Sequence, residues 1–361
     1  MVSFLAFSRP SRAWLVSLAL MITSLALTAC GSDPEDKDTS AEADGAGGGA
    51  NDAANDANSG GTIEADGTGD STAAKPDALR VLNYNVMCSF CKNSDHPDWV
   101  QDWKSRVPWL LDVLTRHDAD IVCTQELQAI GIPTGAPDEF GQILPPGYET
   151  FYYLHKAGDL LEMDYPDAAI AWRASRFSKV SDGSFWLSPT PEVAFSAGFD
   201  AGGQLPRLVV WVRLHDKLGN RDITIVNTHF DNNAPSQDKS APLLLERLQP
   251  LAKETPLLVM GDFNSAPDTT AYATLIGGVP ALSSDQPALI DSFGVAKSGK
   301  GAVSNVTPLP DWVESERIDH VYYHGPFTID RWVVDLWRYG DKIQAPSDHP
   351  GAIVVDVQWP Q

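Results

Sequence analysis

Six short clusters of carboxylate, amide and imidazole side chains stand at the ends of apolar, strand-like runs. The clusters are Asn83-Tyr84-Asn85, Thr124-Gln125-Glu126, Asn227-Thr228-His229, Gly261-Asp262-Phe263-Asn264, Arg317-Ile318-Asp319-His320 and Ser347-Asp348-His349. Four clusters follow such a run and two precede one. Because oppositely running strands of a mixed sheet bring both kinds of end to one edge, all six clusters can meet in one cleft.

Such a cleft would bring four carboxylates close together, those of Glu126, Asp262, Asp319 and Asp348. Like charges raise one another's pKa, so four ionised groups need a compensating cation. The ligands on offer are carboxylate and amide oxygens without cysteine, which suits Mg²⁺, with Mn²⁺ as the alternative, better than zinc. The pattern predicts a divalent-metal site whose ion is shared with a phosphate group.

The order of these motifs resembles the endonuclease/exonuclease/phosphatase superfamily. That superfamily includes pancreatic deoxyribonuclease, abasic-site endonucleases, bacterial sphingomyelinases, inositol polyphosphate 5-phosphatases and deadenylases. The resemblance covers nearly all of residues 79–361, and Phe185 to Glu192 with Pro206-Arg207 is similar to a bacterial branch. It implies an α+β fold, a four-layer α/β/β/α sandwich of two mixed β-sheets, and metal-dependent hydrolysis of phosphoesters.

The resemblance also implies ligands for the metal and the substrate. Asn85 and Glu126 would hold the catalytic metal, with Glu126 as its principal ligand. Asp348 would support the metal or orient its neighbours. Arg207 would contact the phosphate, although an ordinary surface arginine is an equally good interpretation.

The remaining motif residues would handle protons and charge. Asp262 would polarise or deprotonate the attacking water, and Asn264 would position the phosphate or the water. Asp319 would accept a hydrogen bond from His349, which fixes the tautomer of His349, raises its pKa and lets it stabilise the transition state. His229 would donate to a phosphate oxygen or protonate the leaving group. The division of acid and base work among Asp262, His229 and His349 stays open.

Each motif also has a purely structural interpretation. Gly261-Asp262 and Asp348-His349 could be turns, and a lone His229 would more often be a core or surface histidine. Their combination makes catalysis the stronger interpretation. His320 alternates away from Asp319 and is expected to be structural. The same expectation holds for the histidines outside the motifs, which are His96, His117, His155, His215 and His324.

Eight apolar runs with strand composition can position the clusters. They are Leu79–Tyr84, Ile121–Thr124, Ala168–Trp172, Leu208–Leu214, Ile223–Asn227, Leu257–Met260, Asp319–Tyr323 and Ala352–Val357. Apolar residues at helical spacing predict helices over Trp99–Thr115 and Lys239–Lys253. Lys297–Trp312, rich in Gly, Ser and Pro, is expected to form a long loop beside the site.

Residues 1–29 have the pattern of a targeting signal. Arg9 and Arg12 precede an apolar stretch that ends in Leu27-Thr28-Ala29-Cys30. These four residues resemble a bacterial lipobox, which implies cleavage before Cys30 and lipid on its thiol; an ordinary secretory signal is the alternative. Gly31 favours attachment to the outer membrane. We therefore expect an outer-membrane-anchored lipoprotein of the cell envelope, or a secreted protein.

Residues 30–78 are rich in Gly, Ala, Asp, Asn and Ser and should form a flexible acidic tether to a catalytic domain at 79–361. The signal carries two positive charges and the tether a net of about −10, so about −14 of the total of −22 belongs to 79–361. Polyphosphate binding needs clustered Lys and Arg, and none occurs. Duplex DNA is thus disfavoured, though not excluded. The expected partners are a small phosphoester or lipid-headgroup substrate and, through the anchor, the membrane; we expect a monomer.

The leading functional prediction is Mg²⁺-dependent hydrolysis of a phosphoester by in-line attack of an activated water, with a diester in a lipid headgroup or nucleotide slightly preferred. The alternatives are a secreted nuclease acting on DNA or RNA, and a catalytically silent binding lipoprotein with the same fold. Cys88 and Cys91 are spaced for a small disulfide or could stay reduced, and Cys123 should be a buried core residue.

The lipobox generates the first prediction. In a bacterial host with an outer membrane, Cys30→Ser should move the protein from the membrane fraction to the soluble envelope fraction, because the acylated thiol is lost. Immunoblots of the two fractions measure this, with Ser32→Ala as a control that stays with the membrane. Retention of Cys30→Ser in the membrane would refute lipid anchoring at this residue.

Overall fold

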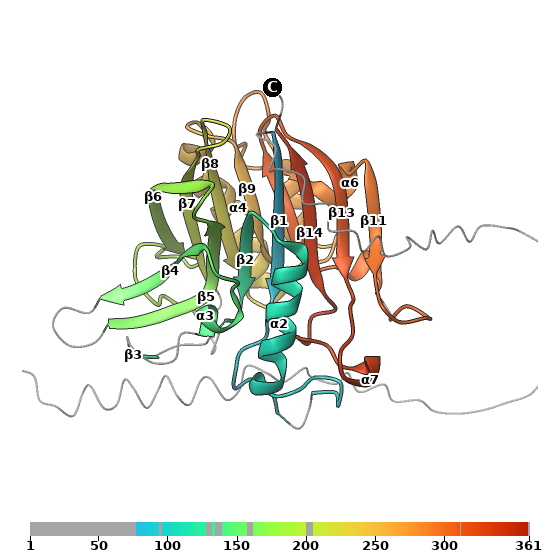
Figure 1. The fold of residues 1–361 in the computed structure, drawn as a ribbon. Helices are drawn as coiled ribbons and strands as arrows, with labels where there is room; N and C mark the ends of the chain where they lie inside the picture. The colour runs from blue at the N-terminus through green and yellow to red at the C-terminus, as the bar shows by residue number, and fades with distance from the viewer. Residues whose placement is uncertain are drawn as a thin grey trace, which may run out of the picture.

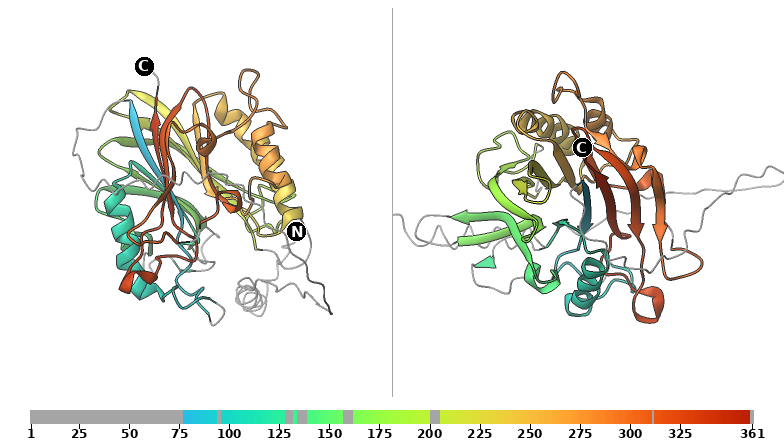
Figure 2. Two further views of the ribbon diagram at one scale, coloured as in Figure 1. Left: turned by 90° about the vertical axis from the view of Figure 1, so that its right-hand side faces the viewer. Right: turned by 45° about the horizontal axis from the view of Figure 1, so that its top comes forward.

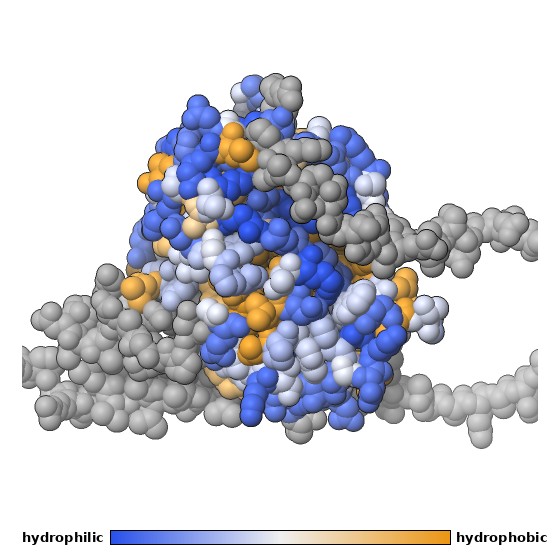
Figure 3. Space-filling view, in the orientation of Figure 1, coloured by the Kyte–Doolittle hydropathy of each residue, from blue (hydrophilic) through white to orange (hydrophobic). Residues whose placement is uncertain are grey.

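The computed structural model describes residues 77–93, 96–127, 132–133, 139–156, 162–199, 205–310 and 312–359. The expected signal, the lipid site Cys30 and the tether up to residue 76 lie outside these residues, as does the side chain of His155. Within the described residues, every helix is too short or too polar to cross a membrane. Hydrophilic residues cover most of the face in Figure 3, with scattered hydrophobic patches between them.

Two mixed β-sheets pack face to face (Figure 1). The first has the order β11-β13-β14-β1-β2-β5-β3, with β4 paired to β5. Its strands are β1 (Ala78–Asn85), β2 (Ile121–Gln125), β3 (Ile132–Pro133), β4 (Tyr148–Lys156), β5 (Glu162–Arg173), β11 (Ser298–Val303), β13 (Thr328–Asp335) and β14 (Ala352–Gln358). The second has the order β10-β12-β9-β8-β7-β6. Its strands are β6 (Phe177–Trp186), β7 (Leu208–Asp216), β8 (Arg221–His229), β9 (Leu257–Asp262), β10 (Ile290–Asp291) and β12 (Asp319–His324).

Helices cover the outer faces of both sheets, which completes four layers (Figure 2). Leu110 and Leu114 of α2 (Trp103–His117) pack against the first sheet, and Leu244 and Leu248 of α4 (Ala234–Ala252) pack against the second. The shorter helices are α3 (Glu139–Ile143), α5 (Thr270–Gly277), α6 (Ser292–Val295), α7 (Gly340–Ile343) and the 3-10 turn η1 (Glu314–Glu316). A third apolar cluster fills the space between the sheets. The expected α/β/β/α sandwich is confirmed.

All eight expected strands are present, and the structure adds six that were not expected, β3, β4, β6, β10, β11 and β13. The two expected helices differ from the observed ones at their ends. Helix α2 begins at Trp103 and not Trp99, because Asp102 caps it and Val100 forms a parallel bridge with Ala345. Helix α4 begins five residues early because the side chain of Asn233 accepts a hydrogen bond from the Ser236 N–H.

The expectation of a long loop over Lys297–Trp312 is wrong for the first part of this segment. Ser298–Val303 forms β11, the edge strand of the first sheet, and pairs in parallel with β13. Gly299 adopts a φ of +85°, and the ladder shifts register between Gly299 and Gly301. Backbone pairing thus accommodates a glycine-rich run that side-chain composition assigns to a loop.

Strand register brings the polar clusters to one edge of the sandwich. His229 lies beside Asp262 in the parallel pair β8–β9, and Asp319 lies opposite Asp262 in the antiparallel pair β9–β12. Asn85 lies beside Gln125 in the parallel pair β1–β2. This edge carries the carboxyl ends of four strands and the start of β12, as the motif order predicts. We call it the catalytic rim.

Three buried amides join the two sheets just beneath the catalytic rim. Gln125 Nε2 donates to Asn83 Oδ1 at 2.9 Å in its own sheet and to Asn227 Oδ1 at 2.7 Å in the other sheet. Asn83 Nδ2 donates to the carbonyl oxygen of Gly261, at 3.1 Å, in the second sheet. All three amide side chains are fully buried, so these bonds fix how the sheets face each other.

The structural role expected for His320 yields a pH prediction. His320 is buried, its Nε2 donates to the Ser265 carbonyl at 2.8 Å, and burial lowers its pKa to about 4. The unfolded chain, with a pKa near 6.5, binds the proton first, so stability is complete above about pH 6.5 and falls as pH drops toward about 4. At roughly 1.4 kcal/mol per pKa unit, His320 should account for about 3 kcal/mol of that loss.

Urea unfolding at pH 7 and at pH 4.5 measures this effect. The wild-type protein should lose more free energy of unfolding between the two values than His320→Gln, which has no titrating ring. The matched control is His215→Gln, a partly exposed histidine of β7. If wild type and His320→Gln lost the same free energy of unfolding, the pKa of His320 would not be lowered in the folded protein.

Candidate active site

Two of the polar residues at the catalytic rim have left-handed backbone. Glu126 follows β2 with a φ of +57°, and Asn264 follows β9 with a φ of +48°. Such values are uncommon outside glycine and occur where the surrounding structure enforces them. Here the Glu126 N–H donates to the Asp167 carbonyl at 3.0 Å, and the Asn264 N–H donates to Asp262 Oδ1 at 2.8 Å. Both turns aim their side chains into the cleft.

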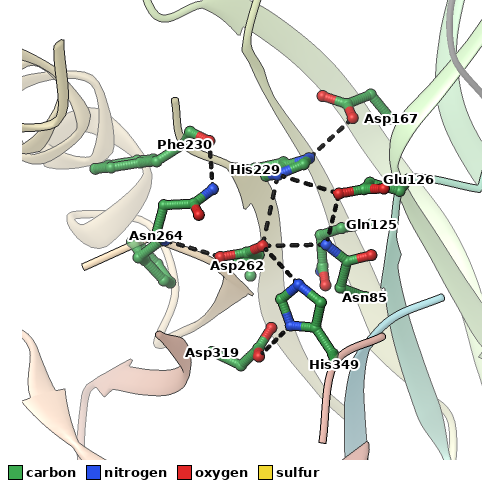
Figure 4. A network of polar contacts seen from close by, with 12 residues as sticks. Asn85, Gln125, Glu126, Asp167, His229, Phe230, Asp262, Asn264, Asp319 and His349 are labelled. Atoms are coloured by element: carbon green, nitrogen blue, oxygen red, sulfur yellow. Dashed lines mark hydrogen bonds and ion pairs between the residues drawn. The ribbon is translucent and has the colours of Figure 1, made fainter. Parts of the chain in front are cut away.

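Asn85 lies between the two central carboxylates (Figure 4). Its Nδ2 donates to Glu126 Oε1 at 3.0 Å and to Asp262 Oδ2 at 3.1 Å. Its Oδ1 accepts from the Met87 N–H at 3.0 Å. Asp262 is buried with 1 % of its side chain exposed, whereas Glu126 has 27 % exposed. Glu126 is therefore the carboxylate open to incoming ions.

His349 stands between two carboxylates. Its Nδ1 donates to Asp319 Oδ2 at 2.7 Å, which leaves Nε2 facing Asp262 Oδ2 at 3.4 Å. Burial alone would lower the pKa of His349, but Asp319 and Asp262 outweigh burial and raise the pKa well above its usual value. His349 is therefore an imidazolium that can donate a proton or a charged hydrogen bond into the cleft.

His229 approaches Asp262 from β8, the strand next to β9 in the same sheet. Its Nε2 lies 3.5 Å from Asp262 Oδ2 and 3.8 Å from Glu126 Oε1, and its Nδ1 lies 2.9 Å from Asp167 Oδ1. Burial and Arg207 would lower the pKa of His229, but Asp167 and Asp262 raise it overall. The raised pKa favours the protonated form of this second imidazole beside Asp262.

Arg207 is buried beside His229 and not exposed on the surface. Its Nη1 lies 2.8 Å from His229 Nδ1 and 3.6 Å from Asp167 Oδ1. One Nδ1 cannot both donate to Asp167 and accept from Arg207. Because the pKa of His229 is raised, we place the proton on Nδ1 toward Asp167 and assign Arg207 as an ion-pair partner of that carboxylate.

The cleft has the donor set of a divalent-metal site. Glu126, Asp262 and His349 each offer a ligand atom, and these atoms lie within 4.8 Å of one another. A protonated His349 cannot ligate, so the two carboxylates would hold the ion, and hard oxygen ligands suit Mg²⁺. Asn85 would have to turn its amide oxygen away from Met87 to join them.

Asp348, expected to support the metal, lies outside this trio. Its Oδ1 accepts a hydrogen bond from Ser347 Oγ at 3.1 Å, and its Oδ2 lies 3.8 Å from His96 Nε2. Ser347 Oγ is 2.7 Å from the Asn85 carbonyl oxygen. This geometry fits the alternative role of orienting neighbours better than direct ligation.

Comparison with known proteins matches a family model, described as Endonuclease/Exonuclease/phosphatase family, to residues 82–349. The chain belongs to the endonuclease/exonuclease/phosphatase family. Members of this family typically hydrolyse phosphoesters and depend on divalent metals. The match spans every motif from β1 to His349, so the fold and the family predicted from motif order are both confirmed.

Solved structures of family members are similar over most of the chain. One from Bacteroides thetaiotaomicron is 27 % identical with a TM-score of 0.60 and covers 80 % of this chain and 100 % of that one. A mannosyl-6-phosphatase of the same organism is 27 % identical with a TM-score of 0.59 and covers 78 % and 100 %. Carbon catabolite repressor protein 4 homolog 2 of Arabidopsis thaliana is 27 % identical over 252 residues, which is 59 % of this chain and 40 % of that protein. The chain therefore spans under half of that relative.

Two buried residues of the active site, Asp167 and Arg106, were not predicted from the sequence. Asp167 orients His229, and the only signal for it is a lone acid directly before the apolar run Ala168–Trp172. Arg106 was also missed, although its spacing of four residues from Leu110 places it on the apolar face of α2.

Arg106 holds the loops on either side of the cleft together. It is fully buried, and its Nη1 donates to the carbonyls of Val86 at 2.6 Å and Pro346 at 3.0 Å. Its Nη2 donates to the carbonyls of Met87 at 3.1 Å and Cys88 at 3.0 Å. The same loop is closed by a disulfide between Cys88 and Cys91, which settles a pairing left open above, and Cys123 is buried as expected. The segments carrying Asn85 and His349 are thus fixed to one guanidinium group.

The contact between Asp167 and His229 yields the next prediction. Asp167→Asn should lower the pKa of His229 and reduce kcat by about 10–100-fold, because the neutral amide no longer favours the imidazolium. Histidine NMR titration and turnover of a phosphoester with Mg²⁺ measure the two effects. Asp216→Asn, which removes an equally buried carboxylate from its pair with Arg176, is the control and should leave both unchanged. An unaltered His229 titration in Asp167→Asn would contradict this role.

Proposed function

We propose that this protein hydrolyses a small phosphoester with Mg²⁺ by in-line attack of water on phosphorus. The observation that carries the proposal is the surroundings of Asp262 Oδ2, which has one imidazole nitrogen at 3.4 Å and another at 3.5 Å, from His349 and His229. Two imidazoles with raised pKa values beside a buried carboxylate form an acid–base set, and partly exposed Glu126 next to them would supply the ion's ligand. Family membership supports the same reaction class.

The carboxylates of the cleft would bind the ion and activate the attacking water. Glu126, the more exposed carboxylate, would be the principal ligand of the ion, with the Asn85 amide beside it; when bound, the ion polarises the phosphate and offsets its charge. Asp262 accepts the proton of the attacking water. Its position is fixed by the Asn264 N–H on Oδ1, while Asn264 Nδ2 is held by the Phe230 carbonyl at 3.0 Å.

The two histidines act on the phosphate oxygens and on the leaving group. His349, kept protonated by Asp319, donates to the negative oxygens that develop as the water adds. His229, kept protonated by Asp167, gives its Nε2 proton to the leaving oxygen. Each histidine is therefore paired with its own buried carboxylate, which sets its tautomer.

Several classes of phosphoester fit the proposed reaction. A diester in a lipid headgroup or nucleotide, preferred from the sequence, and a sugar phosphate both meet the demands of the site. Likeness to the mannosyl-6-phosphatase at 27 % identity supports the sugar phosphate. A fungal relative from Emericella nidulans, a 3'-5'-exoribonuclease subunit 40 % identical over 330 residues, supports the nuclease alternative.

A hydrolysis panel tests the proposal. It should span mannose 6-phosphate, sphingomyelin, phosphoinositides, nucleotides, cyclic dinucleotides and both forms of DNA, each with Mg²⁺, Mn²⁺ or Ca²⁺. We expect activity that EDTA abolishes and Mg²⁺ restores. Asp262→Ala and His349→Ala should each lose at least ~10²-fold in kcat, because each removes a proton-transfer group.

His215→Ala, a histidine paired with Asp222 outside the cleft, is the matched control and should keep activity within about twofold. Near-normal turnover in Asp262→Ala or His349→Ala would remove that residue from the mechanism. No hydrolysis of any substrate, together with no Mg²⁺ binding by calorimetry, would favour the silent binding protein.

A further inference from the structure

The loop that follows β1 carries a disulfide close in sequence to the active site. Cys88 and Cys91 form it, just after Asn85, whose amide lies between the two central carboxylates (Figure 4). The two cysteines differ in access, because Cys88 is only 1 % exposed whereas Cys91 is partly exposed. A reductant in solution therefore reaches this disulfide from the Cys91 side.

Met87 links the disulfide to Asn85. Its N–H donates to Asn85 Oδ1 at 3.0 Å, which turns Nδ2 of the same amide toward Glu126 and Asp262. Met87 has left-handed backbone, with a φ of +54°, and a residue with a side chain keeps this conformation only where neighbouring structure enforces it. The orientation of the Asn85 amide thus depends on what holds this one turn.

Two restraints hold the turn at Met87. Arg106 Nη2 donates to the carbonyl oxygens of Met87 at 3.1 Å and Cys88 at 3.0 Å. On the far side, the disulfide ties Cys88 to Cys91, whose N–H donates to the Cys88 carbonyl at 3.3 Å. This hydrogen bond is long, and Phe90 between the two cysteines is exposed. The cross-link is therefore the strong restraint on the chain that leaves the turn.

We propose that the disulfide between Cys88 and Cys91 positions the Asn85 amide for ion binding, so that the affinity of the cleft for Mg²⁺ depends on the redox state of this cysteine pair. In its fixed orientation the amide bonds Glu126 Oε1 and Asp262 Oδ2 through one nitrogen, which places both carboxylates before the ion arrives. This inference rests on the ion site of the proposed function and adds a redox control to it.

Reduction by a dithiol would release the turn. A thiolate of the reagent attacks the Cys91 sulfur, the S–S bond breaks, and Cys88 leaves as a thiolate that takes up a proton. The second thiol of the reagent then displaces Cys91, so two electrons and two protons pass to the cysteine pair and the reagent becomes a cyclic disulfide. Met87 can then return to ordinary backbone and withdraw its N–H from Asn85. Ordering the freed amide again would cost binding affinity.

Hydrogen–deuterium exchange tests the structural link in the metal-free full chain. After treatment with dithiothreitol, the Met87 amide should exchange at least about tenfold faster than in the oxidised protein, because its hydrogen bond to Asn85 is lost. The amide of Val259, buried in the middle of β9, should exchange at its original rate. Cys91→Ser should show the same fast exchange at Met87, with no further response to dithiothreitol.

Calorimetric titration of Mg²⁺ tests the effect on the ion site. Reduced wild type and Cys91→Ser should bind Mg²⁺ about tenfold more weakly than oxidised wild type, as expected when a group that orients metal ligands is released. Glutathione disulfide should restore binding to reduced wild type and leave Cys91→Ser unchanged. The matched control is Cys123→Ala, which removes the buried free thiol of β2 and should respond to the dithiol as wild type does.

The possible outcomes separate this inference from the proposed function. Equal Mg²⁺ binding in both redox states, or equal acceleration of exchange at Met87 and Val259, would overturn the inference. Tighter Mg²⁺ binding after reduction would also overturn it, because the Met87 N–H would then compete with the ion for Asn85. Weaker Mg²⁺ binding after reduction, without hydrolysis of any phosphoester by the oxidised protein, would retain the redox control and reject the proposed function.

Discussion

Gln125 spans the interface between the two sheets with one amide group, and the active site is built directly on its two hydrogen bonds. Glu126 is the next residue along the chain, and His229 lies two residues beyond the Asn227 that accepts from Gln125. A buried amide left without its partners costs about 1–3 kcal/mol, so the sheets cannot slide past one another without penalty. Because the cleft residues come from both sheets, this constraint sets the distances on which proton transfer depends.

Buried charge is distributed in the cleft by pairing each histidine with a carboxylate of its own. Asp167 supports His229 and Asp319 supports His349, while Asp262 faces both rings. Removing any one group would leave its partner buried and uncompensated, which costs free energy because these side chains are largely shielded from water. The arrangement therefore keeps two acids and one base charged at the same time.

The motifs revealed much of this site because side-chain alternation and strand ends are local properties. Asn85, Glu126, Asp262, His229 and His349 could each be read from a few residues of sequence, and the mixed sheets bring them together. Asp167 and Arg106 could not, since their partners are residues 62 positions away or backbone carbonyls that carry no residue identity. The β11 strand was missed for a related reason: its pairing depends on β13, and its own composition is that of a loop.

The antiparallel register of β1 and β14 pairs Ala78 with Gln358, so the polypeptide enters and leaves the sandwich at the end opposite the catalytic rim. Any attachment upstream of β1 therefore joins the domain at the end opposite the catalytic rim. A molecule arriving from the surrounding medium meets the open cleft directly, whereas a headgroup in the surface that bears the attachment is reached only if the domain turns over. Orientation alone thus gives freely diffusing substrates the easier route.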